Sequence, residues 1–123
     1  MEDIKNALPQ VIADHFAAQG AHDPDAFIAT FAPDALLNDA RREFVGHEAI
    51  RAWAAKEIFG DNVRTEVVQA YAHKGAYIVH ARFDGDFDKA NLPDPVILTC
   101  YFNLVDDRIS QLIIVLNKSI WTG

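Results

Sequence analysis

The chain has 123 residues, half of them hydrophobic, and a formal net charge of −7 from 11 basic and 18 acidic side chains. This length suits a single domain over residues 1–123 with a core of its own, and the hydrophobic content excludes a disordered chain. The acidic balance argues against nucleic acid or an anionic membrane surface as a partner, because both require clustered Lys and Arg.

Targeting signals and cysteines suggest where the protein works. No apolar run approaches the roughly 20 residues of a membrane-spanning helix, and the opening MEDIKNALPQ lacks the features of a secretory signal. Cys100 is the only cysteine, so an internal disulfide is excluded. We therefore expect a cytoplasmic protein.

The first half of the sequence predicts helices and a short pair of strands. Apolar residues at three- and four-residue spacings indicate helices over residues 4–19, 24–31 and 47–59. Pro9 disfavours a helix interior, so the first helix either begins near this residue or is kinked there. Asp23 before Pro24 is typical of a helix start. Strands over residues 35–39 and 43–45 flank a turn at residues 40–42.

The second half predicts strands over residues 63–73, 76–87, 96–105 and 109–118. Lys74-Gly75 and Asp106-Asp107-Arg108 are tight-turn signals. Helices followed by a run of strands indicate an α+β fold, in which three N-terminal helices pack on a strongly curved, mixed but mostly antiparallel sheet.

Alternation gives each long strand two faces, and both are rich in apolar residues. The face expected to meet the helices carries residues such as Val79, Phe83 and Leu98. The opposite face carries Ile78, Ile97, Tyr101, Ile113 and Val115. A solvated face would not normally hold so many apolar side chains, so we expect a homodimer through this outer face.

Two segments carry a resemblance to a known family: DPDAFIATFAPDALLND (residues 23–39) and GHEAIRAWAAKEI (residues 46–58). With the order of elements, the whole chain resembles the nuclear transport factor 2-like superfamily, and within it the SnoaL-like and ketosteroid isomerase-like branch. The resemblance implies a cone-shaped α+β barrel around an apolar cavity, commonly dimeric through the outer sheet face.

The resemblance also implies a candidate site. In ketosteroid isomerases the general base follows, by eight residues, the phenylalanine that ends the second helix, and the same count from Phe31 gives Asp39. Two donors to the substrate oxygen correspond to His15 and Cys100, and a cavity-lining aromatic corresponds to Trp53. Cysteine is a weak donor and His15 replaces a tyrosine, so we do not expect ketosteroid isomerisation.

The two candidate catalytic residues, Asp39 and His15, each allow a structural interpretation. In an apolar cavity Asp39 would be a competent general base; alternatively it is a strand-end residue paired with Arg41 or Arg42. His15 lies on the buried stripe of the first helix, so it is either a satisfied core residue or a second acid/base facing Asp39.

The remaining expectations concern ligands. The expected ligand-pocket residues are Phe16, Phe31, Trp53, Tyr77, Val79, Phe83, Cys100, Phe102, Leu112, Ile114 and Trp121. We expect no metal, because the histidines show no ligand spacing, and no nucleotide or other cofactor, because a glycine-rich phosphate loop is missing.

These observations favour a protein that binds a hydrophobic small molecule in an apolar cavity. As an enzyme it would be a cofactor-free isomerase, cyclase, dehydratase or hydrolase that uses Asp39 as general base or acid. The alternatives are a non-catalytic ligand-binding module and a structural or interaction domain.

Overall fold

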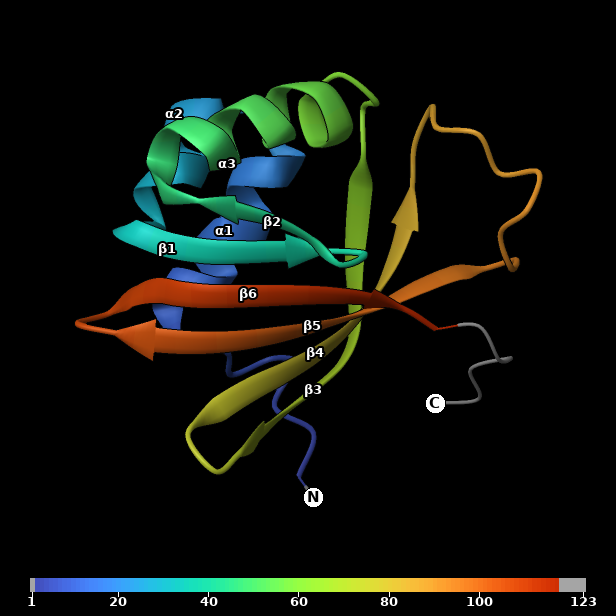
Figure 1. Cartoon of the computed structure of the whole chain (residues 1–123). Coiled ribbons are helices and arrows are strands. Elements are labelled where there is room, and N and C mark those ends of the chain that lie inside the picture. Colours follow the sequence, from blue (N-terminus) through green and yellow to red (C-terminus); the bar gives the residue numbers. More distant parts are fainter. Residues whose placement is uncertain (1, 118–123) are drawn as a thin grey trace.

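A computed structural model describes residues 2–117 as a six-stranded sheet with helices on one side (Figure 1). The helices are α1 (Gln10–Gly20), α2 (Pro24–Ala29) and α3 (Gly46–Ala54), and α3 continues into the π-helical turn η1 (Ala55–Phe59). The strands are β1 (Phe31–Asp39), β2 (Arg42–Val45), β3 (Arg64–His73), β4 (Ala76–Asp84), β5 (Val96–Val105) and β6 (Arg108–Leu116).

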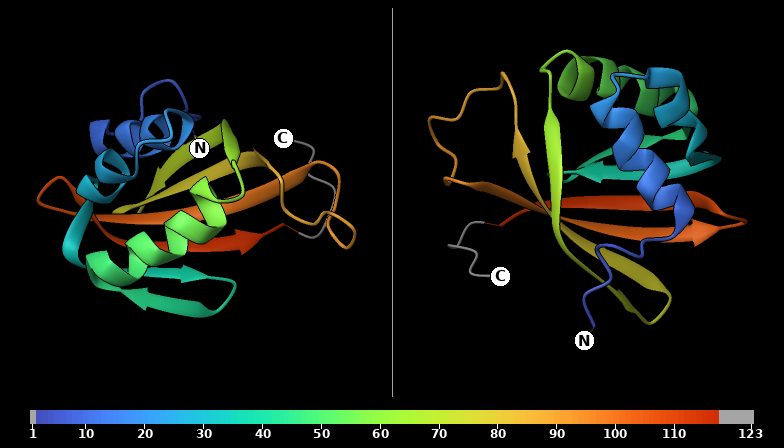
Figure 2. Two further views of the ribbon diagram at one scale, coloured as in Figure 1. Left: turned by 90° about the horizontal axis from the view of Figure 1, so that it is seen from above. Right: turned by 180° about the vertical axis from the view of Figure 1, so that it is seen from behind.

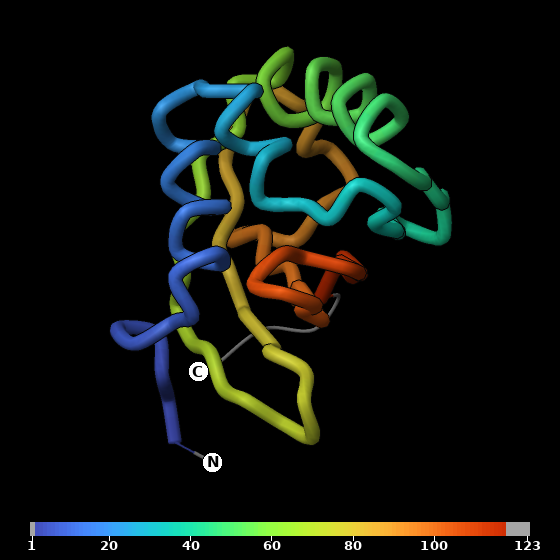
Figure 3. Tube along the Cα trace, turned by 90° about the vertical axis from the view of Figure 1, so that its left-hand side faces the viewer, coloured from blue at the N-terminus to red at the C-terminus, as the bar shows by residue number. Residues whose placement is uncertain are grey.

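The sheet has the order β2-β1-β6-β5-β4-β3, in which β1 runs parallel to β6 and every other pair is antiparallel. Figure 3 shows the strong curvature of the sheet, with α1 along one side and α3 across the top. The predicted class, α+β with a curved, mostly antiparallel sheet, is therefore confirmed. Among the described residues, no helix is long and apolar enough to cross a bilayer.

The N-terminal segment resolves the two alternatives around Pro9. Helix α1 begins at Gln10, because Pro9 precedes the first turn, where its missing N–H removes no helical bond. The residues before it lie along the edge of β3: the Ile4 N–H donates to the Ala70 carbonyl at 2.7 Å, and Asp3 Oδ1 accepts from the Ala70 N–H at 3.1 Å.

The second helix ends earlier than the spacing predicts. Asp23 Oδ1 caps α2 by accepting from the Ala26 N–H at 3.1 Å, as expected of this residue. Phe31 is no longer helical; it opens β1 and pairs with Ile109 of β6. The register of this pair shifts before Leu36, in the segment that contains Pro33, which has no N–H to give the ladder.

The helices cover the inner face of the sheet, as the two views in Figure 2 show. Val79, Phe102 and Leu112 are buried there, whereas Tyr101 and Val115 on the outer face are 38% and 46% exposed. This agrees with the predicted alternation of the strands. Ile97, also assigned to the outer face, is buried. The homodimer stays a prediction.

Candidate functional site

Asp39 and Arg42 face each other at the tip of the β1–β2 hairpin, where they are paired in the register. The turn between them consists of Ala40 and Arg41, with φ angles of 52° and 70°. A turn with two positive φ angles fits the twist of a hairpin, although Gly and Asn adopt it more readily. Asn38 supports it, because its Oδ1 accepts from the Arg41 N–H at 3.0 Å. The hairpin thereby holds Arg42 beside Asp39.

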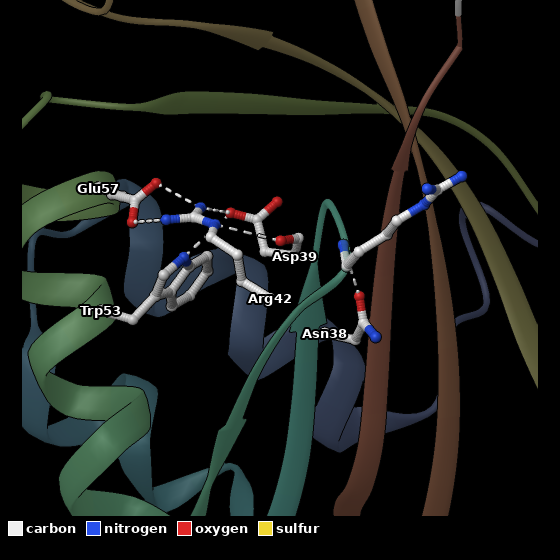
Figure 4. Close-up of polar contacts among 6 residues, drawn as sticks. Asn38, Asp39, Arg42, Trp53 and Glu57 are labelled. Atoms are coloured by element: carbon white, nitrogen blue, oxygen red, sulfur yellow. Dashed lines mark hydrogen bonds and ion pairs between the residues drawn. The ribbon is translucent and has the colours of Figure 1, made fainter.

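Arg42 joins two carboxylates, as Figure 4 shows. Its Nη2 donates to Asp39 Oδ2 and to Glu57 Oε1, both at 2.7 Å, and its Nη1 donates to Glu57 Oε2 at 2.8 Å. The hydrogen bonds to Glu57 are the main reason why the pKa of Arg42 is raised. Trp53 Nε1 also donates to Asp39 Oδ2, at 3.1 Å. Within residues 2–117, Oδ1 of Asp39 makes no hydrogen bond.

Asp39 is also part of the wall of a cavity of about 300 Å³. The polar part of this wall consists of Asp39, Glu57 and Asp61. The rest of the wall is apolar: Trp53, Ile58, Val63, Phe83, Phe87, Leu92, Val96, Leu98, Ile114 and Leu116. The two interpretations of Asp39 therefore coexist, since it is both a strand-end residue paired with Arg42 and a residue lining this cavity.

Two backbone features shape the cavity beside Asp39. Glu57 in η1 follows Trp53 in α3 by four residues, so both side chains lie on the same side of the continuous helix. The loop after β4 passes close to residues 61–62, where the Asp86 N–H donates to the Asp61 carbonyl at 2.7 Å. A Cβ on Gly85 would lie 2.8 Å from that same carbonyl oxygen, so this close approach requires glycine.

His15 lies in a closed aromatic part of the interior. It is 2% exposed, and its ring lies between 4.7 and 5.5 Å, centroid to centroid, from the rings of Phe16, Phe27, Phe31 and Phe102. The Thr30 hydroxyl donates to the Phe27 carbonyl at 2.7 Å, so its oxygen accepts from Nδ1–H of His15 at 3.3 Å. Burial lowers the pKa of His15 to about 3, which leaves the ring neutral at neutral pH.

The predicted pair of Asp39 and His15 does not form. Their side chains share no hydrogen bond, and His15 is not among the described residues that line the cavity. The physical reason is the helix register: α1 directs His15 into the phenylalanine cluster, where its Nδ1 bonds to Thr30.

Of the predicted pocket residues, Trp53, Phe83 and Ile114 line the cavity. Seven others pack in the core or against it: Phe16, Phe31, Tyr77, Val79, Cys100, Phe102 and Leu112. These seven residues were expected to line the pocket and are core residues instead, because aromatic side chains fill that end of the interior. The pKa of the Cys100 thiol is raised to about 12, mainly by burial and to a smaller extent by the negative charge of Asp39. Trp121 lies outside the described residues.

The prediction missed several cavity residues, including Glu57, Asp61, Phe87 and Leu92. Glu57 could have been found, because it stands four residues after Trp53 on the predicted helix. Phe87 was assigned to the strand that starts at Ala76, but β4 ends at Asp84. The path of the loop beyond it depends on a tertiary contact that carries no sequence signal of its own.

Comparisons with known proteins agree on one family. The family model described as "SnoaL-like domain" matches residues 12–112. A crystal structure from Sinorhizobium meliloti, provisionally assigned as a polyketide cyclase, is 33% identical to the chain, with a TM-score of 0.77 over 88% of this chain and 95% of that one. No curated protein sequence matches.

More distant structures share the fold alone. A protein from Catenulispora acidiphila with a ketosteroid isomerase-like fold, solved with trimethylamine, is 21% identical, with a TM-score of 0.75 over 89% of this chain and 86% of that one. TerC, co-crystallised with polyporic acid, is 10% identical, with a TM-score of 0.72 over 88% of this chain and 89% of that one. The family match over residues 12–112, together with the Sinorhizobium relative, shows that the chain belongs to the SnoaL-like domain family.

Proposed function

We propose that the chain binds a small, mostly apolar molecule in the cavity beside Asp39 and transfers a proton to or from it. The observation that carries this proposal is a carboxylate, one oxygen of which is unbonded within residues 2–117, in an otherwise largely apolar wall. Concave apolar sites with few polar groups are the usual form of small-molecule sites. The related folds solved with trimethylamine and with polyporic acid support a ligand-binding role.

Asp39 would act as the general base. Arg42 and Trp53 hold its Oδ2 from two directions and so fix the orientation of the carboxylate. Oδ1 is left to accept a proton from a bound ligand and to return it at another atom. Proton transfer of this kind serves isomerisation, cyclisation, dehydration or hydrolysis of a ring-containing substrate without a cofactor.

The test is Asp39→Asn, which keeps the shape of the side chain and removes its basicity. Ring-containing compounds are first screened by thermal shift, and those that bind are assayed for turnover. We expect turnover to fall by about 10²- to 10⁴-fold, with a nearly unchanged melting temperature because the Arg42–Asp39 ion pair is partly exposed. Asp34→Asn, an exposed position on the same strand, is the matched control. Unchanged turnover in Asp39→Asn rejects the assigned role.

A second candidate function is ligand binding without catalysis. It is favoured because His15 does not line the cavity. The three ionisable side chains among the described residues of the wall are therefore all carboxylates. Free hydrogen-bond donors to the oxygen of an enolate are then missing from the described part of the wall, since the Trp53 N–H is bonded to Asp39. Tight binding of a compound that wild-type protein never converts would favour this candidate.

A further inference from the structure

The ionisable side chains in the described part of the cavity wall are all acidic. Asp39, Glu57 and Asp61 are its ionisable groups among the described residues. Arg42 offsets one of these negative charges, because its guanidinium is bonded to both Asp39 and Glu57. The Asp61 carboxylate has no hydrogen bond or ion pair within residues 2–117. The cavity thus combines apolar walls with an excess of negative charge.

Such a wall discriminates among ligand classes. An anion is repelled by the carboxylates, and a neutral apolar molecule leaves Asp61 and Oδ1 of Asp39 desolvated without a partner, which is unfavourable. A metal ion is not supported either, since no three acidic, histidine or cysteine side chains of the described chain are placed to hold one. A cation with an apolar body satisfies both parts of the wall.

The aromatic rings add to this preference. Trp53, Phe83 and Phe87 all line the cavity, and the faces of such rings attract organic cations. The Phe87 ring already has Lys89 Nζ 5.5 Å from its centroid. That ammonium group is paired with Asp84 at 2.6 Å, and Lys89 does not appear among the described residues of the wall. Lys89 therefore does not supply a cation to the cavity.

Within residues 2–117 the Asp61 carboxylate is unpaired and one oxygen of Asp39 is free; from these groups and the aromatic walls we infer that the cavity selects an organic ammonium ion, with its apolar part against Trp53 and Phe83 and its charge toward the carboxylates. This inference rests on the proposed function of the cavity as a ligand site and names the class of ligand. Asp61 is then a specificity residue, distinct from the proton-transfer role of Asp39.

The experiment compares three probes of similar shape: benzyltrimethylammonium, its neutral carbon isostere neopentylbenzene, and the anion benzylphosphonate. Binding is followed in the full chain by the NMR shift of the Trp53 indole N–H, which reports on the cavity wall. We expect the cation to bind at least about ten-fold more tightly than the neutral isostere, and the anion to bind most weakly, since two nearby like or opposite charges shift affinity by this order.

Two matched variants locate the effect. Asp61→Asn should reduce the ratio of cation to neutral affinity several-fold, whereas Asp106→Asn, in the β5–β6 turn away from the cavity wall, should leave the ratio unchanged. A ratio is used because a general loss of folding weakens both probes alike.

The possible outcomes distinguish the inference about the class of ligand from the proposed function of the cavity as a ligand site. If the neutral isostere binds as tightly as the cation, or if Asp61→Asn leaves the ratio unchanged, the inference is overturned and the cavity remains a ligand site. If none of the three probes shifts the Trp53 signal, the inference and the proposed ligand site fail together.

Discussion

Polar side chains are in opposite environments at the two ends of the interior, the closed end around His15 and the open end that borders the cavity beside Asp39. At the closed end, His15 lies among four phenylalanine rings, has Thr30 as its one hydrogen-bond partner in the described part of the chain, and is kept neutral. At the open end, Asp39 accepts hydrogen bonds from Arg42 and Trp53, and its other oxygen has no bond to any described residue. A polar side chain enclosed by core residues contributes to the packing of the fold, whereas a carboxylate with an unbonded oxygen beside a cavity can act on a ligand.

This contrast explains why two residues expected to work together are separated. The closed end carries the large fully buried side chains, among them Phe27, Phe31 and Phe102. The open end, which borders the cavity, carries Trp53, Phe83 and Phe87 among aliphatic residues, and part of its wall is the loop after β4. Substitutions at the closed end should therefore alter stability, and substitutions at the open end should alter binding.

The largest expected effect is at the closed end. Phe102→Ala removes a fully buried ring and should lower the free energy of unfolding by about 3–5 kcal/mol. Phe87→Ala, the matched change in the partly buried cavity wall, should lower it by about 1 kcal/mol or less. Urea denaturation of both variants provides the comparison. Equal losses would show that the two ends do not differ in this way.

The next effect is the pH dependence of stability that His15 causes. The unfolded ring takes up a proton near pH 6.5 and the folded ring only near pH 3. Between these values the unfolded state binds more protons, so His15 makes the protein less stable as the pH falls, by about 1.4 kcal/mol per pH unit.

His15→Asn, which retains a donor toward Thr30, should flatten the slope of unfolding free energy against pH between pH 6 and 4. Chemical denaturation at several pH values gives this slope, and the carboxylates contribute equally to both proteins. An identical slope in the variant would contradict the neutral, buried state of His15.

The smallest effect on stability is expected at the open end. Arg42→Lys keeps the charge but loses the paired N–H donors to Asp39 and Glu57. Since the Arg42 side chain is 49% exposed, the loss should stay below about 1 kcal/mol. The Trp53 indole signal should nevertheless move, because Asp39 would be held less firmly. A loss comparable to that of Phe102→Ala would mean that the open end also carries the stability of the fold.

The fold could be predicted well from local signals. The spacing of apolar residues, the cap at Asp23, Pro9 and the turn residues define most helices and strands, and alternation identifies the buried faces of β4, β5 and β6. Boundaries that depend on tertiary pairing were wrong by a few residues, as at Phe31, where pairing with β6 replaces the last helical turn.

The candidate site was predictable only in part. Asp39 and Trp53 follow from the family resemblance, and both line the cavity. The position of His15 depends on the rotation of α1 about its axis, and the positions of Phe87 and Leu92 depend on a loop that approaches Asp61 at Gly85. Neither is encoded in a residue spacing, because each results from packing between segments far apart in the chain.

The pairing of Asp3 and Ile4 with Ala70 has a practical consequence. β3 is the last strand of the sheet, and an uncovered edge strand offers free N–H and C=O groups to strands of other molecules. Ile4 and Asp3 occupy both groups of Ala70, so the chain shields part of its own edge from aggregation. A purification tag is therefore better placed where it does not displace these first residues.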